Sequence, residues 1–332
     1  MSTSAHIAQW DPARSFTWRD GERTIRFGRG VAAAALDAVE GDFTLLTTGR
    51  GFDEAPGLVR AADQVHLVPP GPVDELARAL RARVRGGTLL ALGGGRVIDV
   101  AKALAAADPP RRVVAIPTTL SGAEMTAIHR MIPGLPPGRA RVRPAVVLAD
   151  PLVMASPPAE ALAATAMNAL GHAAEAPLTA RANPVASMAA HRAAELLVAG
   201  LGDDPDRDAL SLGAILAGYA IGSAGYGLHH VMAQTLARHA GVGHGPANAA
   251  MLPHTLRVLA PEAGDRWPPG LDLVAAAEAG ARRAGAVRLR DLGVTEDALP
   301  LLAAEAARRP ELADTPGPDS AGALRGIYAD AW

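Results

Sequence analysis

Three histidines in the second half of the chain are candidates for a polar site, and two of them stand four residues from an amide side chain. Asn168 and His172 are four residues apart, and His230 and Gln234 repeat that spacing. Residues four apart share one face of a helix, so each pair projects from one side. With His244, these imidazoles are candidates to polarise or protonate a reacting oxygen, or to bind a divalent metal. Taken singly, each histidine also fits a hydrogen-bonded core residue.

Three consecutive glycines separate a strand pattern from a helix pattern in LLALGGGRVIDVAKALAAA, residues 89–107. Without a Cβ the backbone can approach a pyrophosphate closely, and the unpaired N–H groups and dipole of the following helix favour an anion there. A tight structural turn is the alternative interpretation. In AIPTTLSGAEMT another buried strand is followed by hydroxyls at the same expected edge of the sheet, where open α/β folds bind ligands. Those hydroxyls could instead cap the next helix. The cofactor-binding candidates are Gly93, Gly94, Gly95, Arg96, Asp99, Lys102, Thr118, Thr119, Ser121, Thr47 and Thr48.

The elements that must position these residues change character near residue 150. Strands are predicted at 24–27, 43–47, 64–68, 88–92, 113–116 and 144–149, with helices at 31–39, 73–84 and 97–107. Short apolar strands alternating with helices predict a doubly wound parallel sheet covered on both faces. Residues 128–144 are rich in Pro, Gly and Arg and are predicted to form a loop. Later helices are predicted at 158–176, 184–200, 206–222, 225–239, 246–260, 270–284 and 296–308. We therefore expect an α/β dinucleotide-binding domain over 1–151 and an all-α substrate or metal-site domain over 152–332.

Composition excludes several classes of function. The 332 residues are 49% hydrophobic and 20% charged, with a net charge of −2. This balance gives no electrostatic reason to expect nucleic acid or an anionic membrane as partner. The chain has no cysteine, which excludes disulfides, thiolate catalysis and cysteine-ligated clusters. The first residues lack the pattern of a secretion signal, and no run of about 20 apolar residues is present, so we expect a soluble cytoplasmic protein.

Four motifs occur in order: GGGRVIDVAKA, AIPTTLSGAEMT, MNALGHAAEA, and GLHHVMAQ with GHGPANAAMLPH. Together they resemble the iron-containing, or group III, alcohol dehydrogenase family over roughly residues 24–310. The variants TTLSGAEMT, MNALGHAAEA and GLHH look most like the maleylacetate reductase branch. The resemblance implies a dehydroquinate synthase-like fold with the active site between its two domains, and a homodimer. It also implies that Gly94, Gly95, Thr118 and Thr119 touch NAD(H) or NADP(H).

The resemblance also implies a metal site, from which this sequence departs. The family usually holds one divalent iron or zinc ion with an Asp and three histidines. His172, His230 and His244 match those histidines, but Asn168 falls where the Asp is expected, and maleylacetate reductases with Asn there are thought to work without metal. An amide oxygen is a weaker ligand than a carboxylate, so a bound Fe or Zn is doubtful on this pattern. Gln234 replaces a further, non-ligand histidine and removes a titratable group.

The sequence thus predicts an NAD(P)-dependent oxidoreductase that moves a hydride between nicotinamide and a carbonyl or alcohol substrate. His172, His230 and His244 would polarise or protonate the oxygen, and Asn168 would orient the substrate or a histidine. Maleylacetate is the closest substrate analogy. The alternatives are an alcohol or ketone dehydrogenase of specialised metabolism, a non-catalytic cofactor-binding partner on the same fold, and a dehydroquinate synthase or sugar-phosphate dehydrogenase.

Four arginines bear on the choice of coenzyme and of substrate. The segment Thr47–Arg50 has no carboxylate to repel a 2′-phosphate, and Arg50 could pair with one, so NADPH is predicted to be tolerated. Arg139, Arg141 and Arg143 could bind a carboxylate-bearing substrate, or could be solvated loop charges.

Overall fold

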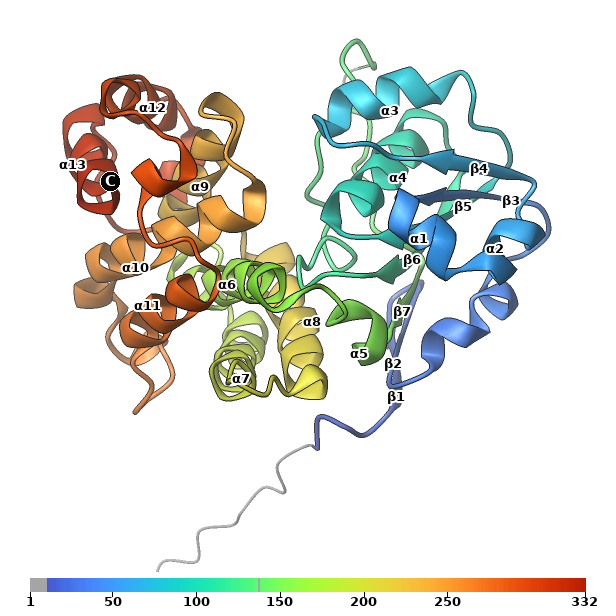
Figure 1. The fold of residues 1–332 in the computed structure, drawn as a ribbon, viewed down its shortest axis with the longest axis horizontal. Helices are drawn as coiled ribbons and strands as arrows, with labels where there is room; N and C mark the ends of the chain where they lie inside the picture. Colours follow the sequence, from blue (N-terminus) through green and yellow to red (C-terminus); the bar gives the residue numbers. More distant parts are fainter. Residues whose placement is uncertain (1–10, 137) are drawn as a thin grey trace, which may run out of the picture.

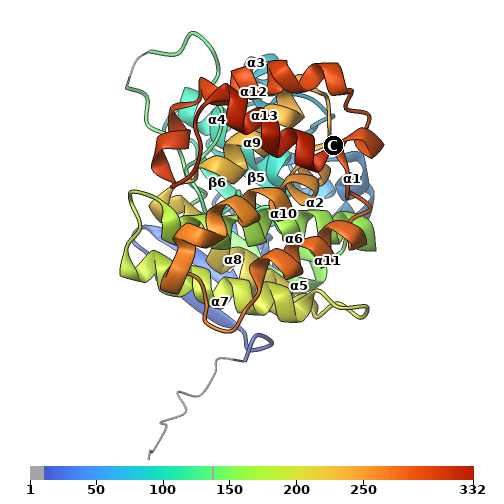
Figure 2. The ribbon, with the colours of Figure 1, turned by 90° about the vertical axis from the view of Figure 1, so that its left-hand side faces the viewer.

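The computed structural model describes residues 11–136 and 138–332 as two adjoining parts (Figures 1 and 2). The first part holds a sheet with helices on both faces, and the second is helical. Part of the N-terminal segment predicted not to be a secretion signal, residues 1–10, lies outside the described residues.

The described residues of the first part form a seven-stranded sheet in the order β1-β2-β7-β6-β5-β3-β4. All neighbouring strands are parallel except β1, which runs antiparallel to β2. The strands are β1 (Phe16–Asp20), β2 (Arg23–Phe27), β3 (Phe43–Thr47), β4 (Gln64–Leu67), β5 (Thr88–Gly93), β6 (Arg112–Pro117) and β7 (Val146–Ala149). The predicted parallel α/β fold is confirmed. Strand β1 was not predicted, because FTWRD at the sheet edge has no apolar run.

Each central strand buries alternate side chains on opposite faces. Leu46, Ala91 and Ala115 lie in the core beneath α3 (Val73–Arg81) and α4 (Gly95–Ala107). Leu45, Leu90 and Ile116 lie in the core of the opposite face, which α1 (Gly49–Glu54) and α2 (Pro56–Ala61) help to cover. Burial on both faces explains why these strands read as continuous apolar runs.

The prediction of a regular helix over residues 31–39 is wrong. The segment forms two short 3-10 turns, η1 (Val31–Ala34) and η2 (Leu36–Ala38). Their backbone N–H groups bond to the carbonyl three residues back, as from Ala33 to Gly30 and from Ala38 to Ala35. A run this short between Gly30 and β3 gives a tight 3-10 connection instead of a regular helix.

The second part is built from helices. They are α5 (Pro151–Met154), α6 (Ala159–Glu175), α7 (Pro184–Gly200), α8 (Arg207–Ala224), α9 (Leu228–His239), α10 (His244–Ala263), α11 (Leu273–Arg283), α12 (Leu299–Ala307) and α13 (Ala321–Ala331). Helices α6 to α12 match the predicted ranges closely, whereas the short α5 was not predicted. Helix α13 was not predicted, because Gly322 and Gly326 weaken its helical pattern. Ser320 nevertheless caps it, since its hydroxyl accepts from the Ala323 N–H.

One hydrophobic core spans both parts. Ile25 and Phe27 of β2 and Val147 of β7 pack in the same buried cluster as α6, α8 and α10. Arg29 also donates to both carboxylate oxygens of Asp208, at the start of α8. The predicted boundary at 151/152 stays a prediction, because side chains on both of its sides share this core.

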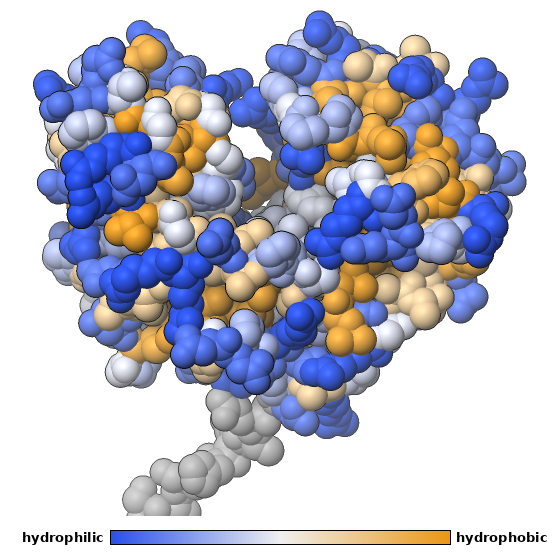
Figure 3. All heavy atoms as spheres, viewed as in Figure 1, coloured by the Kyte–Doolittle hydropathy of each residue, from blue (hydrophilic) through white to orange (hydrophobic). Residues whose placement is uncertain are grey.

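The space-filling view shows the molecule hollowed between the two parts (Figure 3). Strand β5 and helix α4 meet at this side of the first part, while α6 and α9 belong to the second (Figure 1).

Among the described helices none is long and apolar enough by itself to cross a membrane, and only α8 and α9 together pass that test, as a pair bent by 101°.

Candidate active site

The glycine turn meets the threonine-rich motif at the carboxyl end of the sheet. A Cβ built on Gly94 would lie 2.9 Å from the Thr119 Cγ2, and one on Gly95 would lie 3.0 Å from the Ser121 Oγ. The Thr118 N–H donates to the Gly93 carbonyl at 3.0 Å. Any larger residue in the turn would displace these hydroxyl-bearing side chains. The two motifs therefore form one open backbone cradle at the start of α4.

The same loop continues to helix α6 of the second part. The Asn168 Nδ2 donates to the Ser121 carbonyl oxygen at 3.3 Å. Gly122 has a φ of +70°, and a Cβ there would lie 3.0 Å from the Gly218 Cα and 3.4 Å from the His172 Nδ1. This left-handed glycine lets the loop approach both α8 and the imidazole. The cradle and the histidines are thus contiguous.

His172 of α6 and His230 of α9 stack with their ring centroids 4.6 Å apart. Burial, together with the neighbouring histidines, lowers the pKa of His172 well below its ordinary value. Burial and His244 lower the pKa of His230 to about 3. Both rings are therefore neutral at physiological pH. His244, the first residue of α10, contributes electrostatically to both lowered pKa values. The structure thus brings His172 and His230 into contact, while a joint role of His244 with them stays a prediction.

Glu175 fixes the tautomer of His230, and the sequence analysis missed it. The carboxylate is fully buried and accepts from the His230 Nδ1 at 2.5 Å. It also accepts from the backbone N–H groups of His229, at 2.6 Å, and His230. It therefore caps α9, whose N-cap residue Gly227 has no side chain to do so. Burial raises the pKa of Glu175, while these donors oppose that rise.

With its Nδ1–H held by Glu175, His230 presents an unprotonated Nε2. That atom is buried and has no hydrogen-bond partner among the described residues. A neutral imidazole oriented by a carboxylate is an effective proton acceptor and, once protonated, a proton donor. The one acidic residue in the Ala-rich helix sequence MNALGHAAEA was the available indication of this pair.

A model of the Fe-containing alcohol dehydrogenase family, C-terminal region, matches residues 162–332. The chain belongs to the Fe-containing alcohol dehydrogenase family. The match runs from the first turn of α6 through α13 and so includes the histidine cluster, which confirms the resemblance drawn from the four sequence motifs.

Curated relatives and solved structures agree. The chain is 35% identical over 200 residues to maleylacetate reductase 2 of Cupriavidus pinatubonensis, covering 56% of this chain but only 54% of that relative. It is 30% identical over 251 residues to the maleylacetate reductase of Pseudomonas aeruginosa, covering 69% and 70% of the two chains. The crystal structure of maleylacetate reductase from Agrobacterium tumefaciens superposes with a TM-score of 0.80 at 26% identity, covering 96% and 97%.

The family name implies an iron ion, so the doubt about a metal drawn from Asn168 finds no support in the comparisons. The side chains give a separate test. Within residues 11–136 and 138–332, no group of three or more His, Cys, Asp or Glu side chains is placed to hold a metal ion. Asn168 supplies an amide oxygen, and the His172 and His230 rings stack with only 21° between their planes. This donor set does not fit the family's metal.

Lys102 is not available to a phosphate in this family member, contrary to the prediction. Its side chain is fully buried, and its Nζ donates to the Asp99 Oδ1 and to the carbonyls of Ala123 and Ile128, all within 2.9 Å. These three bonds use all three donors of the ammonium group. Lys102 therefore ties α4 to the following loop, and Asp99, at the cleft end of α4, is its ion-pair partner.

The residues after β3 are also occupied by structural contacts. The buried Thr47 hydroxyl donates to the Leu92 carbonyl at 2.9 Å, so the predicted cofactor contact through it is wrong. The Thr48 hydroxyl caps α1 by accepting from Gly51. Arg50 bonds Glu54 at 2.9 Å and Ser156 at 2.6 Å. A carboxylate thus sits beside Arg50, and pairing of Arg50 with a 2′-phosphate stays a prediction.

The three arginines of the predicted loop, Arg139, Arg141 and Arg143, lie in different surroundings. Arg143 pairs with Asp20 at 3.1 Å, at the sheet edge. Arg139 acts electrostatically on Asp108, beyond the far end of α4. Of the three, Arg141 alone influences Asp99, near the glycine turn. Gln234 lies one turn along α9 from His230, where its Oε1 accepts from Arg309 at 3.1 Å.

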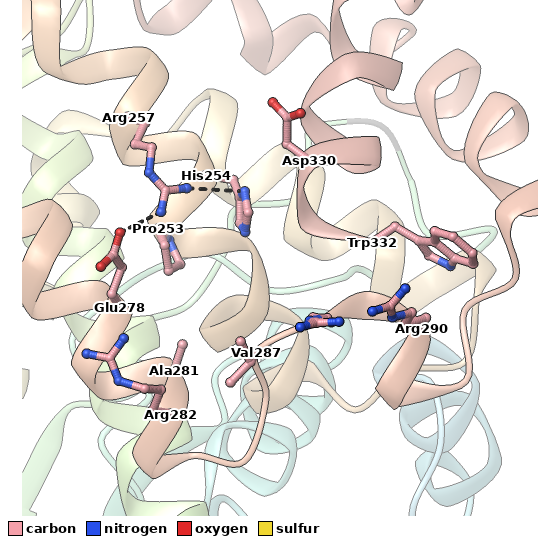
Figure 4. Close-up of a pocket in the computed structure, with 11 residues that line it drawn as sticks. Pro253, His254, Arg257, Glu278, Ala281, Arg282, Val287, Arg290, Asp330 and Trp332 are labelled. Atoms are coloured by element: carbon pink, nitrogen blue, oxygen red, sulfur yellow. Dashed lines mark hydrogen bonds and ion pairs between the residues drawn. The ribbon is translucent and has the colours of Figure 1, made fainter.

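A separate pocket of about 520 Å³ opens on the second part (Figure 4). It lies between α10, α11 and the C-terminal residues, and its lining combines Arg257, Arg282 and Arg290 with Glu278 and Asp330. None of the predicted site residues lines it. We therefore place the candidate active site in the hollow between the two parts.

Proposed function

We propose that this protein is an NAD(P)-dependent oxidoreductase that interconverts a carbonyl compound and its alcohol, with maleylacetate as the model substrate. The main support is the unbroken series of contacts from Gly94 through Thr119 and Ser121 to Asn168 and the paired imidazoles. This series joins a coenzyme cradle to proton-transfer groups. The relatives named maleylacetate reductase support the substrate assignment.

The coenzyme would bind at the start of α4. Gly94 and Gly95 leave room where a Cβ would meet Thr119 and Ser121, and the first N–H groups of α4 face that space. Arg96 supports this placement, because its buried Nε has no partner among the described residues and could donate to a phosphate oxygen. When bound, the nicotinamide supplies or accepts a hydride at C4.

His230 would carry the proton in this reaction. In reduction, the neutral His230 would take up a proton from solvent at Nε2 as the hydride is transferred and pass it to the oxygen of the substrate carbonyl, while Glu175 stabilises the transient positive charge. In oxidation, the neutral Nε2 accepts the hydroxyl proton. His172 and His244 would polarise the same oxygen, and Asn168 would hold His172 and the Ser121 loop in place.

We further propose a cytoplasmic homodimer that acts on a small molecule. Nicotinamide coenzymes are regenerated inside the cell, which supports the location. Strand β1 is an outermost strand of the sheet, and outermost strands are common surfaces for pairing with a second copy. Cell fractionation and light scattering test these two points.

The decisive experiment combines coenzyme binding with turnover. NADH and NADPH are titrated by fluorescence, and NADH oxidation is followed with maleylacetate and with neutral aldehydes and ketones. We expect His230→Gln to lower kcat by about 100-fold or more, because it removes the proton donor. His239→Gln, on an exposed position of the same helix, should leave kcat unchanged. Absence of binding of both coenzymes at millimolar concentration would refute the proposal.

A further inference from the structure

The connection between β6 and β7 is unusually long and irregular. It runs from residue 118 to 145, and its described residues form no helix or strand. Parallel neighbours are ordinarily joined through a helix, and long structureless loops in compact domains are commonly functional. Figure 1 shows this connection in green, passing above α3 and α4. Beyond its first residues, which form the cradle, it has no role in the proposed reaction.

Two buried side chains hold the connection in one shape. Arg23 of β2 donates to the Glu124 carbonyl at 2.7 Å and to the Pro144 carbonyl at 2.8 Å, which joins its two ends. His129 bonds the Arg130 carbonyl through Nδ1 at 3.1 Å and accepts from the Val142 N–H through Nε2 at 3.2 Å. Burial lowers the pKa of His129 to about 4, so it remains neutral and keeps both bonds at physiological pH.

Arg130, next to this anchor, lies at the edge of the first part that borders the hollow. It pairs with Asp74 in the first turn of α3, which follows the carboxyl end of β4 and so begins at the same edge of the sheet as the glycine turn. Burial and the charge of Arg130 also lower the pKa of His244 in the second part. The Arg130 side chain is 42% exposed, and its Nη1 lies 3.4 Å from the Asp74 Oδ1. No other donor of this guanidinium has a partner among the described residues. A positioned cation with free donors therefore lies at the edge of the hollow, across from the part that holds the cluster proposed to bind the reacting oxygen.

We propose that Arg130 binds a carboxylate of the substrate and thereby selects acidic carbonyl compounds over neutral ones. Resting on the proposed function, this inference assigns substrate selection to one residue of the first part, across the hollow from the reacting groups. A guanidinium matches a carboxylate with two parallel hydrogen bonds, which gives orientation as well as affinity. A substrate held by its carboxylate at Arg130 would present its carbonyl to His230 and His244.

The matched control is Arg143, in the same connection. Its side chain is 43% exposed and pairs with Asp20 at 3.1 Å, so it equals Arg130 in exposure and charge but lies at the sheet edge. Turnover of maleylacetate and of its dimethyl ester is compared for wild type, Arg130→Gln and Arg143→Gln. We expect Arg130→Gln to raise KM for the acid at least tenfold, about the effect of one charge-assisted hydrogen bond, with little change in kcat. The ester should react equally well with all three proteins.

A calorimetric titration of succinate into the NADH-loaded proteins provides an independent reading. Weaker binding to Arg130→Gln but not to Arg143→Gln supports the inference, even if no carbonyl compound is reduced and the proposed function fails. Equal binding by wild type and Arg130→Gln overturns it, as does an equal loss of activity toward acid and ester. If wild type and Arg130→Gln turn over acid and ester at the same rates, the assignment of Arg130 is refuted. The oxidoreductase proposal is then still supported.

Discussion

Glu175 links the start of a helix to the orientation of an imidazole, which makes it a positioning residue with a separable effect. Gln in its place still accepts from the backbone of α9, but its NH₂ group would oppose the His230 Nδ1–H. We expect Glu175→Gln to lower kcat by about 10- to 100-fold, the usual cost of losing a buried partner that orients a functional histidine. Steady-state kinetics with NADH measure this.

Coenzyme binding by Glu175→Gln shows whether the variant has lost only the orientation of His230 or its folded structure. Glu175→Gln should retain the wild-type dissociation constant for NADH and the wild-type circular dichroism spectrum, because the cradle at Gly94 does not touch residue 175. The pH at which kcat is half-maximal should also move, since Glu175 influences protonation of His230. An unchanged pH profile together with an unchanged kcat would contradict this role.

Glu124 is a second buried acid, with a different expected effect. Both of its carboxylate oxygens are buried without a partner among the described residues, and burial raises its pKa from 4.5 to about 7. Below pH 4.5 the group is protonated in both the folded and the unfolded chain. Between pH 4.5 and 7 only the unfolded chain loses the proton, so stability falls by about 1.4 kcal/mol per pH unit.

Glu124→Gln should remove this pH-dependent loss. The free energy of unfolding is measured in urea for both proteins at pH 5 and at pH 8. We expect the difference between variant and wild type to shift in favour of the variant by about 2 to 3 kcal/mol from pH 5 to pH 8. The exposed substitution Glu22→Gln is the control and should show no such gain. A difference between Glu124→Gln and wild type that is the same at both pH values would contradict the raised pKa.

Residue roles show where sequence reasoning stopped. The glycine turn and the shared helix face of Asn168 and His172 could be predicted because each depends only on a local motif. Lys102 and Thr47 were misassigned because their partners, Ala123 and Leu92, lie on other segments that only folding brings near. Glu175 was missed for the same reason, since its partner His230 is far away in the sequence.

At the scale of elements, the turn between β5 and α4 should tolerate no side chain. Gly94→Ala would place a Cβ 2.9 Å from Thr119, in the space proposed for the pyrophosphate. We expect the dissociation constant for NADH to rise at least tenfold, through the combined loss of backbone approach and displacement of the loop. Gly57→Ala in α2 meets nothing within 4 Å and should bind NADH as wild type does. Equal affinities of the two variants would argue against the cradle.

The strands of the sheet were predicted better than its connections. Buried runs such as Thr88–Gly93 are specified by apolar residues on both faces, and no competing pattern exists. The crossover at 118–145 has no periodicity, and its shape depends on bonds from Arg23 and His129 to distant carbonyl and amide groups. Its path could not be derived from its own residues.

At the scale of the whole molecule, the shared core predicts that the two parts depend on each other. A fragment of residues 11–157 would expose Ile25, Phe27 and Val147, which are buried against helices of the second part. We expect this fragment to lack a cooperative thermal transition by circular dichroism, whereas the full chain should show one. A fragment with a sharp transition and dispersed NMR resonances would show that the parts fold independently.

Arg23 fastens both ends of the β6–β7 crossover to strand β2, and this has an evolutionary consequence. Lengthening a loop whose ends are already fixed has only a small entropic cost, of about 0.6 kcal/mol per doubling. The stretch between His129 and Val142 can therefore accumulate insertions or be exchanged while β6 and β7 keep their register. Descendants of this chain could acquire new substrates by replacing that stretch alone, with the coenzyme cradle and the imidazoles inherited intact.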